Sequence, residues 1–472
     1  MENSLGSDDL QPAGPSCGAS TARASNRPIE GEKTAEEAAP KRAARLRKPQ
    51  RMQMEMVTRC QDDLVPATHP VRVVEKVIEQ LDLSRFYAPI KAREGTTGRD
   101  TTDPKLLIAL WLYACIRGIG PARELARRCE ESLPFLWLLG GVTVNYHLLS
   151  DFRTDHGAAL DDLFTQVVAS LVDKGVVKVS RLSQDGLRVR VGAGASSFRR
   201  EERLQQLLEE AKQHVEELKK QLSLPGAASA TKRQKAARER AAQERQERLE
   251  QAIAQLAAIK EKQEERAKKA GNGKEGEKIR KKQPRASTTD ADARAMKMPN
   301  GGFNPAVNVQ VASDPESRAI VGVAVSNEGS DSSNLSQPMR QQVEERTEGK
   351  VEQHLIDGGY MKVEDIKAAH EQGVELFVPP KPARNKQNRG HELEPKPGDS
   401  EAILDWKRRM GSAEGKEIYK QRASTSETVN ADLRTQRGLN QVLVRGLKKA
   451  KYVVLWSALA YNVMHFSSAL LS

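Results

Sequence analysis

Cysteine and aromatic residues are scarce in this sequence, and each shortage argues against a class of protein. Only 4% of the 472 residues are aromatic, which disfavours a protein that binds single-stranded nucleic acid by stacking bases on aromatic rings. No two cysteines form a Cys-x-x-Cys pair; they are Cys17, Cys60, Cys115 and Cys129. This spacing disfavours a zinc finger or a disulfide framework and fits a reducing cytoplasm.

Long apolar runs are also rare. The polar and acidic N-terminus gives no sign of a secretory signal. Only residues 452–471 resemble a membrane span, and Asn462 and His465 interrupt that segment. Its apolar residues recur at helical spacing, namely Leu455, Leu459, Val463, Phe466 and Leu470. We therefore predict a buried closing helix in preference to a tail anchor, and a cytoplasmic protein.

Charged residues are abundant and biased towards positive charge. They make up 30% of the chain, and the formal net charge is +12. Such an excess favours a polyanionic partner, either nucleic acid or an anionic membrane surface. Residues 1–60 are rich in Ser, Gly, Pro, Ala and charge, with a basic cluster at 41–51. We predict a disordered basic tail, whose cluster either grips phosphates or stays solvated.

Residues 61–175 have the pattern of short amphipathic helices joined by brief breaks. The spacing predicts a helical DNA-binding domain that enters a groove, although a plain helical bundle gives the same pattern. The segment Ser-Asp-Phe-Arg at 150–153 ends one of these helices, and we expect Arg and His side chains there to face DNA.

Residues 199–285 form a helical insertion of different composition. Apolar residues step by four and three along its first half, namely Leu204, Leu208, Ala211, Val215, Leu218 and Leu222. Pro225 and Gly226 interrupt the pattern, and a second stripe follows at Leu249, Ile253 and Leu256. This seam predicts an antiparallel coiled-coil hairpin. We expect its basic end, 268–285, to be a loop that either attracts phosphate or serves as a solvated linker.

The remaining segments, 176–198 and 286–472, alternate between strand and helix patterns. Val307, Val309 and Val311 alternate with polar residues, and a turn separates them from the apolar run at 319–325. This pattern predicts a hairpin, and further strands and helices follow it. The fold class is therefore α/β, with a sheet of mixed direction and helices packed on it.

Two aspartates interrupt apolar strand patterns in this core. Asp185 lies in LSQDGLRVRV and Asp357 lies in HLIDGGY. Burying a carboxylate is costly unless a cation or hydrogen bonds compensate, so both residues are candidate metal ligands. Each Asp-Gly pair alone is weak evidence, since that dipeptide also marks tight turns. Metal-assisted phosphoryl transfer needs carboxylates from separate elements that converge on two ions.

A third segment, YKQRASTSETVNADLR, places four polar residues on or next to one helix: Tyr419, Arg422, Glu427 and Arg434. Together with the two aspartates, this set resembles the tyrosine–arginine–glutamate–lysine signature of the DDE transposases of bacterial insertion sequences in the IS4/IS5 superfamily. The order of segments is most similar to the IS1182 family. The resemblance covers most of the chain from about residue 65 and includes MPNGGFNPAVNVQV, IDGGYMKVEDI and VPPKPARN.

The resemblance implies an RNase H-like catalytic core that works with two Mg²⁺ ions, with Mn²⁺ as a substitute. The implied metal ligands and catalytic residues are three carboxylates, Asp185, Asp357 and Glu427. The side chains expected to contact DNA are Tyr419, Arg422, Arg434, Lys381 and Arg384. The implied reaction is cleavage at the terminal inverted repeats of the element, followed by attack of the freed 3′-hydroxyl on target DNA. The expected partners are double-stranded DNA, not a membrane, and at least one further copy of the chain.

Two departures from the signature leave alternatives open. The gap from Arg422 to Glu427 is one residue longer than in its commonest form, so Glu417 and Asp432 stay as rivals for the third carboxylate. Arg434 replaces the terminal lysine and keeps its charge. Two other functions are compatible with the sequence. One is a transposase-derived DNA-binding protein that has lost catalysis, and the other is a scaffold that acts through the coiled coil and its basic surface.

Overall fold

The computed structural model describes residues 60–93, 95, 99–223, 232–329, 335–382 and 389–472, with four isolated residues before them. The chain divides into two compact units, Met1–Thr58 and Arg59–Ser472. The tail predicted for residues 1–60, with its basic cluster, lies almost wholly outside the described residues.

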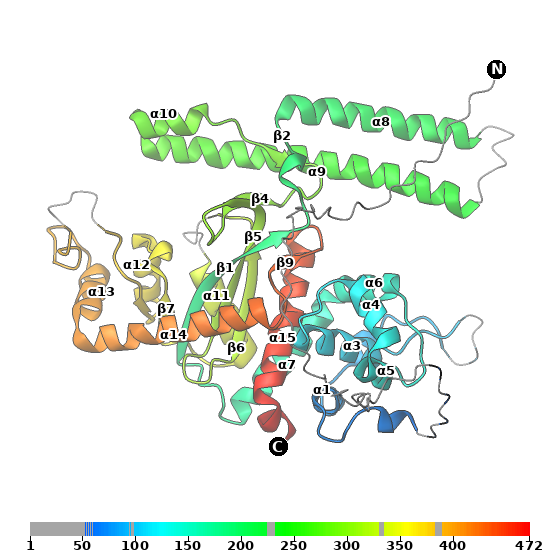
Figure 1. Cartoon of the computed structure of the whole chain (residues 1–472). Coiled ribbons are helices and arrows are strands. Elements are labelled where there is room, and N and C mark those ends of the chain that lie inside the picture. Colours follow the sequence, from blue (N-terminus) through cyan, green and yellow to red (C-terminus); the bar gives the residue numbers. More distant parts are fainter. Residues whose placement is uncertain are drawn as a thin grey trace, which may run out of the picture. The chain divides into compact units, whose positions relative to one another are not determined.

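The region after residue 60 is helical, as its pattern predicts (Figure 1). Asp103 and Asn145 begin two of its helices by accepting hydrogen bonds from main-chain N–H groups of the first turn. The elements are η1 (Gln61–Leu64), α1 (Pro70–Glu79), α2 (Ser84–Tyr87), α3 (Pro104–Ile116), α4 (Ala122–Glu131), α5 (Leu133–Leu139), α6 (Tyr146–Asp155) and α7 (Gly157–Asp173). From Leu107 to Cys115 every side chain of α3 is buried, so α3 is the centre of this helical region.

The C-terminal helix α15 (Leu447–Leu471) joins this helical region to the sheet. It packs against α7 and α3 on one side and β6 on the other. Among the described residues, α15 is the one helix long and apolar enough to cross a membrane, and 67% of its most apolar window is buried within the fold. Asn462 is fully buried and exchanges two hydrogen bonds with the main chain of Ile320. The prediction of a buried closing helix is therefore confirmed.

The core of the unit is a mixed sheet, which the structure describes as seven-stranded. Its strands are β1 (Arg181–Val191), β4 (Arg294–Lys297), β5 (Phe303–Ser313), β6 (Ile320–Ser326), β7 (Gln353–Ile356), β8 (Glu375–Phe377) and β9 (Gln441–Val442). The order β4-β5-β1-β7-β8 places β1 at the middle, and β6 also pairs with β5. β1 runs antiparallel to β5 and parallel to β7 and β9. The predicted mixed α/β sheet and the β5–β6 hairpin are confirmed.

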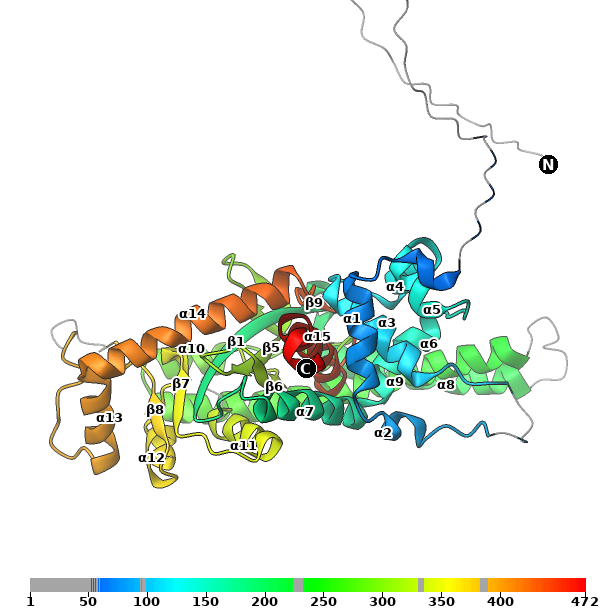
Figure 2. The same cartoon turned by 90° about the horizontal axis from the view of Figure 1, so that it is seen from below.

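Helices cover both faces of the sheet (Figure 2). The helices and turns of this part are α11 (Ser336–Thr347), η3 (Gly358–Tyr360), α12 (Val363–Glu371), α13 (Glu401–Gly411) and α14 (Ala413–Thr435). α14 crosses β1, β5 and β7, and α11 packs on β6 from the other side. The buried hydroxyls of Ser183 on β1 and Ser426 on α14 lie 2.9 Å apart, so α14 rests directly on the central strand.

The insertion leaves the sheet after β1 through a short two-stranded sheet, β2 (Phe198–Arg199) and β3 (Ala286–Ser287). Its helices are α8 (Glu201–Ser223), α9 (Lys232–Ala270) and α10 (Lys274–Lys281). α8 and α9 lie side by side (Figures 1 and 2), and the Glu201 carboxylate at the start of α8 meets the Lys260 ammonium late in α9 at 2.5 Å. The two helices are therefore antiparallel. Knobs-into-holes packing of a coiled coil stays a prediction.

One detail of the insertion differs from the prediction, and a second falls outside the described residues. The basic end predicted as a loop contains α10, which packs on α9. The Gln263 side-chain amide holds the two helices together by donating to the carbonyls of Ile279 and Lys282. The side chain of Leu222 and the Pro225–Gly226 break lie outside the described residues.

Candidate active site

The two candidate aspartates occupy adjacent positions on neighbouring parallel strands. The register of β1 and β7 pairs Gln184 with Ile356, and Asp185 and Asp357 are the next residues along each strand. Asp185 lies within β1, whereas Asp357 follows the last residue of β7 and begins η3. Asp357 is thus just outside the strand in which the sequence pattern placed it. Strand pairing brings together two carboxylates that are 172 positions apart in the sequence.

The guanidinium of Arg422 lies between the two carboxylates. Its Nη2 donates to Asp357 Oδ1 at 3.0 Å, and its Nη1 lies 3.5 Å from Asp185 Oδ1. Nη1 is buried, and among the described residues no acceptor lies within hydrogen-bond geometry of it. One cation therefore serves two acidic groups, through a hydrogen bond to Asp357 and a longer ion pair with Asp185.

The main chain helps to fix both carboxylates. The N–H of Gly186 donates to Asp185 Oδ1 at 2.9 Å, and the N–H of Gly359 approaches Asp357 Oδ2 at 3.3 Å. A Cβ at Gly358 would lie 3.1 Å from the ring of Pro379. A side chain at Gly358 would therefore crowd the segment that follows β8.

Helix α14 presents its polar residues to this pair along one stripe. Tyr419 precedes Arg422 by one turn, and its hydroxyl accepts a hydrogen bond from Arg422 Nε at 3.2 Å. Two turns after Arg422, the side-chain amide of Asn430 donates to Asp185 Oδ2 at 3.1 Å. Arg434, a further turn along, is close enough for its charge to interact with that of Asp185. Residues spaced by three and four share one side of a helix, which explains the stripe.

The electrostatics of the site follow from burial and from the aspartates. Burial alone would lower the pKa of the Arg422 guanidinium, but Asp185, Tyr419 and Asp357 outweigh it, so the pKa lies above its usual value. Burial lowers the pKa of Arg434, and Asp185 offsets part of that effect. Burial also raises the pKa of Tyr419, with Arg422 acting in the opposite direction. The phenol therefore stays protonated, and both arginines stay charged, near neutral pH.

The third predicted carboxylate is not drawn into the pair. Glu427 lies on α14 as predicted, but its side chain is exposed. Within the described ranges, no three His, Cys, Asp or Glu side chains are grouped closely enough to hold a metal ion. The two rivals have other partners: Glu417 pairs with Lys420 at 2.5 Å, and Asp432 pairs with Arg437 at 2.8 Å.

Two family models match parts of the chain. The family described as Transposase domain (DUF772) matches residues 59–155, which span the helical region from η1 to α6. The family described as Transposase DDE domain matches residues 379–466, which contain all of α14. The chain therefore contains two regions that match transposase families, and the second of them is a DDE transposase domain. Its segment order is consistent with the IS1182-like kind. No curated protein and no solved structure matches it.

The other DNA-contact candidates of the transposase can be placed only in part. Lys381 is exposed on the segment that passes Gly358, two residues after Pro379. Arg384 lies outside the described residues. The indole of Trp406 is buried and donates to the carbonyl of Val378 at 3.0 Å. Trp406 therefore packs against the start of this segment, three residues before Lys381.

The expectation that the arginine of the 150–153 segment faces DNA is wrong, whereas the DNA contact expected of the histidines stays a prediction. Arg153, in the segment expected to face DNA, is buried, donates to the carbonyl of Gly120 and lies over the ring of Trp111. Burial lowers its pKa to about 10. The sequence shows only a helix with an arginine near its end. The tertiary packing of α6 against α3 turns this arginine inward.

Asn430 is the site residue that the sequence reasoning missed. It contacts Asp185 directly, although an asparagine is an ordinary residue on a helix surface. Its position was a usable signal, because Asn430 follows Arg422 by eight residues and Ser426 by four. A helical projection of α14 places all three on one side.

Proposed function

We propose that this chain is an active, metal-dependent transposase of a bacterial insertion sequence. It would bind the terminal inverted repeats, hydrolyse a phosphodiester at each element end and join the freed 3′-hydroxyl to target DNA. The observation that carries the proposal is the pair Asp185 and Asp357. They come from neighbouring strands and share the Arg422 cation beneath α14, the helix within the matched DDE domain.

The donor set fits Mg²⁺, with Mn²⁺ as a substitute. Hard carboxylate oxygens suit these ions, which keep several waters and need few protein ligands. Asp185 and Asp357 already converge on one positive group, which is the electrostatic condition for holding a metal ion. Glu427 is our third ligand. It lies one turn before Asn430 and two turns before Arg434 on α14, so it flanks the stripe that reaches Asp185.

The ions, when bound, would supply activation of the attacking water or 3′-hydroxyl and stabilisation of the leaving oxygen. The other steps belong to the residues of the chain. Arg422 balances the charge of the two carboxylates in the DNA-free chain and would offer its guanidinium to a phosphate oxygen when DNA is bound. Tyr419 orients the guanidinium through its hydroxyl, and Arg434 brings a second positive charge to the DNA backbone. Asn430 fixes the outer oxygen of Asp185.

The arrangement around the site supports the rest of the proposal. A mixed sheet with helices on both faces is what an RNase H-like core requires, and its first strand carries Asp185. The helical region matched by the Transposase domain (DUF772) family is our candidate for recognising the terminal repeats. Pairing two element ends needs at least two copies of the chain, and the α8–α9 hairpin is a candidate contact between them. We expect the protein to act on DNA in the bacterial cytoplasm.

A DNA-binding relic is the second candidate function, and one observation favours it. Glu427 is exposed and is not grouped with the two aspartates in the described part of the chain. A protein that lacks a complete set of metal ligands would have this arrangement. Such a chain would bind the element ends through the same basic residues and leave them intact.

The test is Mg²⁺-dependent nicking and strand transfer on a labelled duplex that carries the element's end. The intact chain is compared with Asp357→Asn, Glu427→Gln and the matched control Glu414→Gln, which changes an exposed acid in the first turn of the same helix. Loss of cleavage in the first two variants, with DNA binding retained, supports the proposal. Binding without cleavage by the intact chain supports the relic. Full activity in Glu427→Gln would exclude Glu427 as a ligand.

A further inference from the structure

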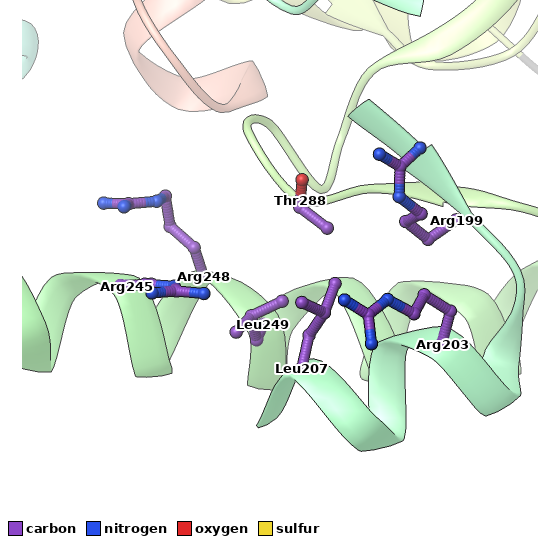
Figure 3. A pocket seen from close by; sticks show the side chains of 7 residues that line it. All are labelled: Arg199, Arg203, Leu207, Arg245, Arg248, Leu249 and Thr288. Carbon is purple, nitrogen blue, oxygen red and sulfur yellow. The ribbon is translucent and has the colours of Figure 1, made fainter. Parts of the chain in front are cut away.

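An arginine pocket of about 370 Å³ lies at the root of the α8–α9 hairpin. Seven residues from four segments line it: Arg199, Arg203, Leu207, Arg245, Arg248, Leu249 and Thr288. Figure 3 shows two arginines at each end of this pocket and the two leucines between them. None of these residues belongs to the aspartate site, so any ligand here is additional to the catalytic chemistry.

Among the described residues, no acidic side chain lines the arginine pocket, and the arginines are only partly balanced by acids outside it. Arg203 pairs with Glu210 at 3.1 Å. Arg248 has a looser contact with Glu244 at 3.8 Å. Arg199 donates to the main-chain carbonyls of Ser196 and Phe198, which carry no charge. The pocket therefore has an excess of positive charge.

Like charges act on the arginines at one end of the pocket. The pKa of Arg248 lies below its usual value, first because of burial and then because of the positive charge of Arg445, while Glu244 opposes the shift. Arg245 adds further repulsion, and Glu247 opposes the shift as Glu244 does. Arg445 lies just before α15 and is exposed. The positive surface thus extends from the pocket onto the body of the protein, and an anion would relieve its repulsion.

We infer that the arginine pocket binds the phosphodiester backbone of duplex DNA, as a second contact outside the catalytic site. Guanidinium groups suit phosphate oxygens, which they can bind through two parallel N–H donors. Arginines at both ends of one pocket, with Arg445 beyond it, fit a chain of phosphates better than a single small anion. The inference rests on the proposed function only in that the chain acts on DNA.

Substitution of Arg245 and Arg248 tests the inference with little risk to the fold, since Arg245 is exposed and Arg248 has only the loose contact with Glu244. In the full chain, Arg245→Gln with Arg248→Gln should weaken duplex binding by about eightfold for each lost contact in ~0.1 M salt. The slope of log K against log salt should become shallower by about 0.9 per contact. Arg245→Lys with Arg248→Lys keeps the charge and should retain most of the affinity.

The matched control is Arg238→Gln with Arg240→Gln, which removes two exposed arginines of α9 outside the pocket. Thermal unfolding confirms that each variant is folded. The inference is overturned if the pocket variant binds duplex as the intact chain does, or loses no more affinity than the control. It is also overturned if titrated inorganic phosphate binds the intact chain and not the pocket variant, while both bind duplex equally. That result would identify a small-anion site.

Cleavage of the same duplex separates this inference from the proposed function. If the intact chain binds through the pocket but cleaves nothing with Mg²⁺, the proposed function fails and the pocket stands. If the intact chain cleaves, and the pocket variant binds and cleaves equally well at low protein concentration, the pocket fails alone. We expect weaker binding by the pocket variant and an unchanged single-turnover cleavage rate at saturating protein.

Discussion

The aspartate site and the arginine pocket are both groups of charged side chains, but their charges are balanced in opposite ways. At the site, one guanidinium lies between two carboxylates, so the pKa of Arg422 is raised in spite of burial. In the pocket, burial and neighbouring positive charges lower the pKa of Arg248. The first group is stable without a ligand, whereas the second gains stability only when an anion arrives. The acidic group can therefore exchange its internal cation for a metal ion, whereas the arginine pocket is suited to bind an anion.

The largest expected effect is the loss of cleavage when one of the two carboxylates of the aspartate site is neutralised. Asp357→Asn removes a metal-binding charge with little change of shape, and it should lower Mg²⁺-dependent cleavage on the order of 10³-fold, since metal catalysis contributes several kcal/mol. Single-turnover cleavage measures the rate, and filter binding measures DNA affinity, which should stay within a few-fold of the intact chain. Cleavage by Asp357→Asn that equals cleavage by the control Glu414→Gln and by the intact chain would mean that the aspartate pair is not catalytic.

A second group of paired charges lies away from the site, around Asp161. It allows the contribution of ion pairing to the stability of the fold to be measured without any effect on catalysis. Asp161 on α7 accepts from Arg346 at 2.8 Å and from Lys451 at 3.0 Å, and so ties α7 to α11 and α15. Asp161→Asn should lower the free energy of unfolding by about 1–2 kcal/mol after allowance for solvent screening. Denaturant titration measures this change, and Asp162→Asn, which breaks only an exposed pair with Arg85, is the matched control.

The same residue predicts a dependence on pH. Burial would raise the pKa of Asp161, but Arg346 and Lys451 hold it below the ordinary value of 3.8. A depressed pKa in the folded state means that the stabilisation is complete above that ordinary value and is lost as the pH falls through the folded pKa. The difference in stability between the intact chain and Asp161→Asn should therefore be full at neutral pH and shrink in strong acid. A difference that grows on acidification would contradict this account.

The sequence predicts the elements and the chemistry of the site better than it predicts their contacts. Apolar alternation locates β1, and the helical stripe of α14 follows from the spacing of Tyr419, Arg422 and Arg434. The expectation that Asp185 and Asp357 lie close together comes from the family resemblance and not from a local pattern. In the structure, the pairing of β1 with β7 brings them together. Strand neighbours so distant in sequence depend on the whole sheet, which no local pattern encodes.

Contacts between elements are where the sequence is least informative. Nothing local distinguishes Arg153, which is buried against Trp111, from an arginine on the surface. Nothing local shows that Arg422 turns towards two carboxylates. Helical spacing places Asn430 on the same side of α14 as Arg422, but it does not show that Asn430 contacts Asp185. The arginine pocket was equally hidden, because its members come from β2, α8, α9 and the segment after β3. Each of these facts is a product of packing between distant segments.

The role of Arg422 as an internal cation gives a smaller and more specific prediction. Arg422→Gln removes the positive group that competes with a metal ion for the two carboxylates. Mn²⁺ should then bind about fivefold more tightly, since a partly buried ion pair contributes on the order of 1 kcal/mol. Isothermal titration of the DNA-free protein measures this affinity, and Lys420→Gln on the same helix is the control. Cleavage should nevertheless fall, because the phosphate contact is lost. Weaker Mn²⁺ binding by Arg422→Gln would mean that the guanidinium assembles the metal site.

The smallest effect tests the unbalanced side of the comparison. If the arginines of the pocket repel one another, replacing Arg245 and Arg248 by glutamine should not destabilise the fold. It should raise the melting temperature by about 1 °C in low salt, because relief of like-charge contacts contributes only a few tenths of a kcal/mol. Salt should erase the difference by screening the repulsion. Added duplex should raise the melting temperature of the intact chain more than that of the variant, since the variant has lost a place to bind it. A variant that melts well below the intact chain would show that the arginines stabilise the hairpin. The role of the pocket would then be structural, like that of Asp161, and the DNA contact would be excluded.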